Sequence, residues 1–316
     1  MCDCRTGASA SIPHFDALVR RSFRELPKRD CGYQATGRTE EGYLSLEISE
    51  DLETLGELNQ LREERASSLS FQSLEELAVQ IVRSGCIEPL TSLVIDPGEL
   101  EITSSWREGL LFRGVCARAR GVMHTIASIL GEMRRDSPAI YAAEAVTPFA
   151  LRLRGLFPRF LGSEFSLDPE IRETFYPIPC EDLQELTLRS NAFDLVSTNE
   201  VLEHVPSIDK ALREIHRVLR PGGWHVGTVP FHFTRETGVR RACLDAGGQI
   251  SHLLEPEYHG DPVGNGALVF EIPGWDIINR ARSAGFSRSF MRFILSTKHG
   301  ILAEHIGGVF VLCCRK

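Results

Sequence analysis

The spacing of apolar residues along the chain changes character near residue 138. Before that point, residues 45–85 are rich in Glu and Leu, and their apolar positions recur every three or four residues, which is typical of amphipathic helices. Breaks in this pattern predict two or three helices rather than one. A further helix is expected over about 115–135, ended by Ser137-Pro138. Residues 1–138 are therefore expected to form a mainly helical extension or cap, and they contain no recognisable chemical motif.

From residue 139 onward, short apolar strands alternate with amphipathic helices. This alternation is typical of an α/β fold whose mostly parallel sheet is covered on both faces. No helix separates the last two strands, so we expect them to pair antiparallel at the sheet edge. In an open sheet of this kind, ligands bind beyond the carboxyl ends of the strands. Helices are expected over 148–156, 207–220 and 274–284, and strands over 140–144, 159–165, 193–200, 223–231, 286–295 and 307–316.

Composition narrows the classes of function. The chain has 43 acidic and 35 basic residues and a net charge of -8, which argues against a surface that coats nucleic acid. Its apolar runs are much shorter than the ~20 residues of a membrane span. The first residues lack the basic and then apolar layout of a secretory signal. We therefore expect a cytoplasmic protein without nucleic-acid or membrane partners, whose nine scattered cysteines are reduced thiols.

Residues 191–223, NAFDLVSTNEVLEHVPSIDKALREIHRVLRPGG, contain the most specific pattern. A strand, FDLVST, leads into a loop and the short helix EVLEHV. A second helix then places Ile208, Leu212, Ile215 and Leu219 on one face. This segment resembles the fourth strand, the following helix and the fifth strand of class I S-adenosylmethionine-dependent methyltransferases. The resemblance covers about 139–316. It implies a Rossmann-like, mostly parallel seven-stranded sheet with an antiparallel final strand, and S-adenosyl-L-methionine as cofactor.

The resemblance also assigns cofactor contacts to residues at the strand ends. Glu144 ends the first strand, where the family keeps an acidic residue near the cofactor's amino group; capping of the next helix is the alternative role. Glu164 ends the second strand, where one carboxylate accepts hydrogen bonds from both ribose hydroxyls. Asp182 is the candidate for the adenine amino group, or forms an Asx turn, and Leu183 would contact the ring. The other predicted contacts are Thr147, Gly162, Ser163, Glu200, and, at the sulfonium centre, Thr198 and Asn199.

The loop after the first strand departs from the family pattern. The family has a glycine-rich loop there, whereas this chain reads Glu144-Ala145-Val146-Thr147-Pro148, without glycine. Glycine allows a backbone to approach a ligand closely, and Ala145 and Val146 add Cβ atoms in that space. Pro148 suits the first turn of a helix, so the strand–turn–helix geometry is expected to survive. A subgroup of the superfamily shares this loss.

Four polar residues are candidates for catalysis on the acceptor side. His204 lies four residues after Glu200, and a histidine can act as a general base near neutral pH; packing or loop anchoring is the alternative role. His232 follows the fifth strand between two phenylalanines. Tyr258 and His259 lie in an insertion of about 40 residues, a length typical of functional lids, although His259 also suits a turn. No HExxH motif or CxxC pair accompanies these residues, so no metal site is predicted.

Together these features predict an S-adenosylmethionine-dependent methyltransferase that acts on an oxygen or nitrogen atom of a small molecule. One alternative is a cyclase or lyase that consumes the same cofactor and releases methylthioadenosine, which the altered first loop motivates. A second alternative is a non-catalytic binding or regulatory subunit. The helices within 1–138 are also candidates for a homodimer contact.

Overall fold

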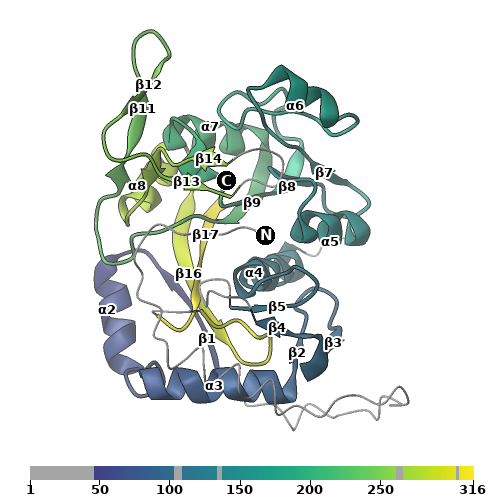
Figure 1. The fold of residues 1–316 in the computed structure, drawn as a ribbon, viewed down its shortest axis with the longest axis vertical. Helices are drawn as coiled ribbons and strands as arrows, with labels where there is room; N and C mark the ends of the chain where they lie inside the picture. The colour runs from purple at the N-terminus through teal and green to yellow at the C-terminus, as the bar shows by residue number, and fades with distance from the viewer. Residues whose placement is uncertain (1–45, 103–108, 134–136, 261–265, 304–305) are drawn as a thin grey trace.

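A seven-stranded mixed sheet forms the centre of the computed structural model, which describes residues 46–102, 109–133, 137–260, 266–303 and 306–316 (Figure 1). The strand order is β1-β16-β17-β9-β8-β6-β7. The strands β7, β6, β8 and β9 run parallel, and β17, β16 and β1 follow antiparallel. This confirms the predicted α/β class with a parallel core. The bounds are β1 (Glu47–Leu52), β6 (Ile140–Ala142), β7 (Phe160–Gly162), β8 (Phe193–Asn199), β9 (Leu219–Thr228), β16 (Arg288–Ser296) and β17 (Val309–Arg315).

One strand of this sheet comes from the region expected to be a helical cap. The segment β1 pairs antiparallel with β16, so β1 rather than the last strand pair occupies the edge. The helical expectation is wrong for this segment because Ile48 and Leu52 face the core while Asp51 binds two arginines of β16. Between β7 and β8, a parallel bridge joins Glu164 and Cys180.

Helices cover both faces of the sheet. The helix α4 (Ala117–Met133) packs on β17 and β9, and α5 (Pro148–Leu156) packs on β7. On the other face lie α7 (Ile208–Val218) and α8 (Asp276–Ser283). The two-residue period of the strands divides their side chains between two apolar clusters. In β16, Phe290 belongs to the cluster with α4, whereas Met291 belongs to the cluster with α7 and α8.

The described N-terminal elements pack onto this same core. Leu58 and Ile81, from α2 (Leu55–Glu64) and α3 (Phe71–Ser84), belong to the cluster that contains Phe293 of β16. In Figure 1, α2, α3 and four short strands lie toward one end of the sheet, away from α6 (Pro169–Thr174). Both helices thus pack against the sheet through this cluster. The short elements are β2 (Cys86–Ile87), β3 (Val94–Ile95), a 3₁₀ turn at Pro97–Glu99, β4 (Glu101–Ile102) and β5 (Leu110–Leu111).

The insertion between β9 and α8 folds into small two-stranded units. The hairpin β11–β12 projects from the molecule, and β13–β14 lies closer to the sheet (Figure 1). No helix among the described residues combines the length and the apolar character that crossing a bilayer requires. The bounds are β10 (Val239–Arg240), β11 (Ala242–Leu244), β12 (Ile250–His252), β13 (Tyr258–His259), β14 (Ala267–Leu268) and β15 (Glu271–Ile272).

Candidate active site

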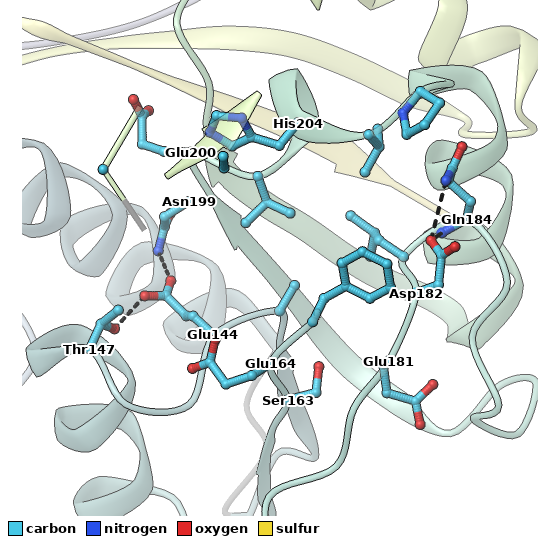
Figure 2. A pocket seen from close by; sticks show the side chains of 18 residues that line it. Glu144, Thr147, Ser163, Glu164, Glu181, Asp182, Gln184, Asn199, Glu200 and His204 are labelled. Atoms are coloured by element: carbon cyan, nitrogen blue, oxygen red, sulfur yellow. Dashed lines mark hydrogen bonds between the residues drawn. The ribbon is translucent and has the colours of Figure 1, made fainter. Parts of the chain in front are cut away.

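A pocket of about 190 Å³ opens beyond the carboxyl ends of β6, β7 and β8, where the sequence predicts the ligand site (Figure 2). The loops that follow these strands supply most of its wall. Backbone direction alone brings them together, because the ends of parallel strands meet at one edge of the sheet. The predicted residues that line the pocket are Glu144, Thr147, Ser163, Glu164, Asp182, Leu183, Asn199, Glu200 and His204.

Glu144 is a buried carboxylate between two donors, as Figure 2 shows. The Thr147 hydroxyl donates to Oε2, and Nδ2 of Asn199 donates to Oε1 at 2.6 Å. Burial nevertheless raises the pKa of Glu144 to about 7. The other amide atom of Asn199, Oδ1, is buried and has no hydrogen-bond partner. The acceptor atoms of Glu144 and Asn199, from adjacent strands, therefore lie close together here, which suits an ammonium group.

Glu164 holds the loop that lacks glycine. Its Oε1 accepts hydrogen bonds from the backbone N–H groups of Ala145, at 2.7 Å, and Val146, at 3.0 Å. No residue from 143 to 147 has a positive φ, so this loop does not need glycine for its conformation. The backbone that needs glycine is instead that of Gly162 in β7, which lies close to the backbone of Glu144. An added Cβ on Gly162 would lie 2.7 Å from the Glu144 carbonyl oxygen. The departure from the family pattern thus leaves the strand–turn–helix geometry intact.

The third loop presents an acid and an apolar wall. Oδ1 of Asp182 accepts from the backbone N–H of Gln184 at 2.8 Å, which is the Asx turn considered as its alternative role. Gln184 in turn accepts from the N–H of Ser207 at 3.1 Å, which joins this loop to the start of α7. Leu183 is buried, whereas Phe165 lines the pocket with 46% of its surface exposed. Phe165 and Gln184 are absent from the predicted set, although Phe165 directly follows the predicted Glu164.

Glu200 lies at the end of β8 in a strained backbone conformation. Its φ is +52°, a value that residues other than glycine rarely adopt. Residues with such backbone strain are frequent at functional sites. Its carboxylate pairs with Arg118 of α4, the two atoms being 3.4 Å apart. The helix α4 thus extends from the N-terminal region to the pocket wall. Nothing in the local sequence of α4 predicts this contact.

A further acid, Glu203, lies beside His204 in the 3₁₀ turn Leu202–His204. Glu203 is fully buried, and its Oε1 lies 3.3 Å from Nε2 of His204 and 3.6 Å from Nδ1 of His259. The two imidazole rings stand edge to face, with centroids 5.2 Å apart. His259 thus reaches the site through Glu203 rather than by lining the pocket. Glu203 belongs to the EVLEHV segment of the resemblance, but only the folded insertion brings His259 to it.

Several predicted residues lie outside the pocket lining. Thr198 precedes Asn199, so its side chain points to the opposite face of β8, where its hydroxyl is 2.9 Å from Nε2 of the buried His225. His232 is partly buried in the loop after β9, and burial lowers its pKa. Tyr258 is 60% exposed on β13. The remaining residue, Gly162, acts through the close approach described above.

Comparison with known families agrees with this geometry. Residues 167–227 match the family model described as a methyltransferase domain. This segment of the chain is therefore similar to a methyltransferase domain. The matched segment runs from just before α6 to the end of β9, and it includes Asp182, Asn199, Glu200 and His204. No curated protein matches the sequence.

Three solved methyltransferase structures are similar to the chain. An S-adenosylmethionine-dependent methyltransferase from Mesorhizobium loti is 15% identical, with 60% of this chain and 97% of that chain covered and a TM-score of 0.36. The 1,6-didemethyltoxoflavin-N1-methyltransferase of Burkholderia thailandensis, solved with bound 1,6-didemethyltoxoflavin and S-adenosylhomocysteine, is 16% identical, with 63% of this chain and 78% of that chain covered and a TM-score of 0.37. A Methanosarcina mazei methyltransferase is 15% identical over 60% and 96%, with a TM-score of 0.35.

Proposed function

We propose that this protein is a methyltransferase that transfers the sulfonium methyl group of S-adenosylmethionine to an oxygen or nitrogen atom of a small molecule. The observation that supports it best is the pair of acceptors formed by Glu144 and by the unpartnered Oδ1 of Asn199. A buried acceptor without a donor is costly, so the pocket favours a ligand that brings donors to this corner. The α-ammonium group of the cofactor supplies both the donors and the positive charge.

The other pocket residues suit the rest of that molecule. The carboxylate of Glu164 lines the pocket while it holds the 145–146 loop, and it would accept hydrogen bonds from the ribose hydroxyls. Asp182 would accept from the adenine amino group, with Leu183 and Phe165 packing against the ring. Bound in this way, the cofactor supplies an electrophilic methyl group. The chain's contribution is to hold donor and acceptor in line and to exclude water, which accounts for much of the rate gain in bimolecular reactions.

His204 is the predicted acceptor-side residue that lines the pocket. His232, Tyr258 and His259 stay predictions for acceptor contacts from the insertion. The negative net charge of -8 favours a small-molecule acceptor over nucleic acid. Self-association through residues 1–138 is a separate prediction, which sedimentation equilibrium would test.

Calorimetric titration with S-adenosylmethionine at pH 8 tests the cofactor assignment. We expect one site in the wild type and at least a tenfold weaker affinity in Asn199→Ala, because the ammonium group loses an acceptor. Glu170→Gln, an exposed change on the surface of α6, is the matched control and should bind like the wild type. An unchanged affinity in Asn199→Ala would contradict the placement of the ammonium group.

Product analysis then tests the reaction. Methyl transfer yields S-adenosylhomocysteine in the presence of an acceptor, so a panel of small phenols, acids and amines should release it. Methylthioadenosine as the product would identify the cyclase or lyase alternative instead. A folded protein that does not bind the cofactor would be the non-catalytic subunit, and either result would refute the proposal.

A further inference from the structure

Three metal-ligand side chains converge at the wall of the pocket. Glu203 and His204 come from the 3₁₀ turn after β8, and His259 comes from β13 in the insertion. One ligand atom from each lies within 4.8 Å of the others. The cluster borders the pocket, because His204, Gly260 and Ala267 all line it.

The hydrogen bonds on the outer sides of the two rings determine where their protons lie. Nδ1 of His204 is 2.9 Å from the carbonyl oxygen of Leu268, and a carbonyl oxygen only accepts, so Nδ1 carries a proton. Nε2 of His259 is 3.1 Å from Oε1 of Glu257, and an ionised carboxylate only accepts, so Nε2 carries a proton. In the neutral rings, the inner nitrogens of His204 and His259 therefore direct lone pairs at the same oxygen of Glu203.

With both rings neutral, this arrangement lacks a positive charge at its centre. Glu203 is fully buried, and neither of its carboxylate oxygens has a hydrogen-bond partner. A buried carboxylate that faces two lone pairs is strongly unfavourable unless a cation lies between them. A bound metal ion removes this cost for all three groups at once.

We propose that Glu203, His204 and His259 bind a divalent first-row transition-metal ion. Two imidazoles and one carboxylate suit zinc or iron better than the all-oxygen sets preferred by magnesium and calcium. Ligand atoms around a tetrahedral ion lie about 3.4 Å apart when the bonds are about 2.1 Å, and Oε1 of Glu203 lies 3.3 and 3.6 Å from the two ring nitrogens. The outer N–H groups donate to a carbonyl and a carboxylate, as metal-bound histidines commonly do.

The position of the metal site beside the pocket indicates a role for the ion in methyl transfer. This role rests on the proposed function, whereas the metal site itself does not. An ion held by three protein ligands keeps a coordination position for water or substrate, and His204 places it at the pocket wall. The ion would lower the pKa of a coordinated hydroxyl or amine of the acceptor, whose proton passes to solvent. The acceptor's lone pair then forms a bond to the methyl carbon as the carbon–sulfur bond breaks, and that electron pair stays on sulfur.

Metal binding is measured directly, without turnover. Chelator-treated protein is titrated with Zn(II) by calorimetry and with Co(II) by visible absorption. The ligand-field bands of bound Co(II) report nitrogen and oxygen ligands, and thiolate bands would reveal binding to cysteine. We expect one equivalent in the wild type and at least a hundredfold loss of affinity in Glu203→Gln and His259→Ala. Glu257→Gln, which removes a charged hydrogen-bond partner of His259, should weaken binding about 10–100-fold.

His252→Ala is the matched control, because His252 is exposed on β12 outside the cluster and its removal should leave the site unchanged. Circular dichroism and the thermal midpoint of each variant confirm folding, and Glu203→Gln keeps the side-chain volume. No binding by the wild type, or equal binding in Glu203→Gln and His259→Ala, would overturn the site and leave a protonated histidine as the partner of Glu203. Binding of S-adenosylmethionine is titrated in a separate experiment with chelator present. A wild-type protein that binds metal but not the cofactor would refute only the proposed function.

Discussion

Replacing Glu144 by glutamine should raise the stability of this protein but weaken ligand binding in the pocket. Burial raises the pKa of Glu144 from its ordinary value of 4.5 to about 7. The folded state therefore holds this proton more tightly than the unfolded state does. The corresponding stabilisation is complete below pH 4.5 and is lost as the pH rises through 7. By pH 8 the loss amounts to about 3 kcal/mol, against about 1 kcal/mol at pH 5.

Glutamine avoids this loss because it does not ionise. Its Oε1 would still accept from Asn199, and its Nε2 would donate to the Thr147 hydroxyl, which replaces both hydrogen bonds of the acid. We therefore expect urea unfolding to show a gain in the free energy of unfolding that is about 2 kcal/mol larger at pH 8 than at pH 5. A stability difference that is the same at both pH values would refute the raised pKa. Glu170→Gln, on the surface of α6, controls for the loss of a negative charge.

The same substitution should weaken cofactor binding. An ammonium group prefers the ionised carboxylate, so the affinity of the wild type for S-adenosylmethionine should rise between pH 6 and pH 8, as Glu144 loses its proton near pH 7. In Glu144→Gln the affinity should be at least tenfold lower at pH 8 and nearly independent of pH. Calorimetric titrations at pH 6, 7 and 8 measure both effects. An affinity that rises equally with pH in the variant would place the titrating group elsewhere.

Three further predictions concern the scaffold, and urea unfolding measures each. Burial lowers the pKa of His225 from 6.5 to about 3, so the folded state loses stability as the pH falls below 6.5. Between pH 7 and pH 5, His225→Leu should lose about 2 kcal/mol less stability than the wild type. An equal loss in both proteins would contradict the lowered pKa. Arg120 is fully buried and donates to four backbone carbonyl oxygens, so Arg120→Met should cost at least about 3 kcal/mol; a cost below 1 kcal/mol would show that these carbonyls find other donors. In Gly121→Ala the new Cβ would lie 2.5 Å from Cγ2 of Val309, which should cost about 1–3 kcal/mol, and no cost would show that α4 moves away from β17 freely.

Local pattern was sufficient for the parallel half of the sheet and its helices. The predicted helix over 148–156 matches α5, because Thr147 caps it and Pro148 suits its first turn. The helix expected over 207–220 ends earlier, at Val218, because Arg220-Pro221-Gly222-Gly223 lies within β9. The resemblance named Glu144 and Glu164, and both line the pocket, because residues just beyond the ends of parallel strands lie at the edge where ligands bind.

The local pattern of apolar and polar residues does not predict contacts between distant segments. The residues of β1 fit a helix as well as a strand, and the choice depends on Asp51 meeting Arg292, which lies far along the chain. The ability of residues 143–147 to form their turn without glycine depends on their φ angles and on the hydrogen bonds from Glu164. Neither can be read from residue types.

The cluster of Glu203, His204 and His259 could likewise be predicted only in part from the sequence. The neighbours Glu203 and His204 are visible in the sequence as part of a family-like segment, but their spacing predicts no metal site. His259 joins them only because the insertion folds back and Leu268 of β14 binds His204. Periodicity and strand ends determine which elements form and where a pocket opens, because they depend on neighbouring residues. Which side chains share a buried charge depends on packing between distant segments, and only the tertiary structure decides it.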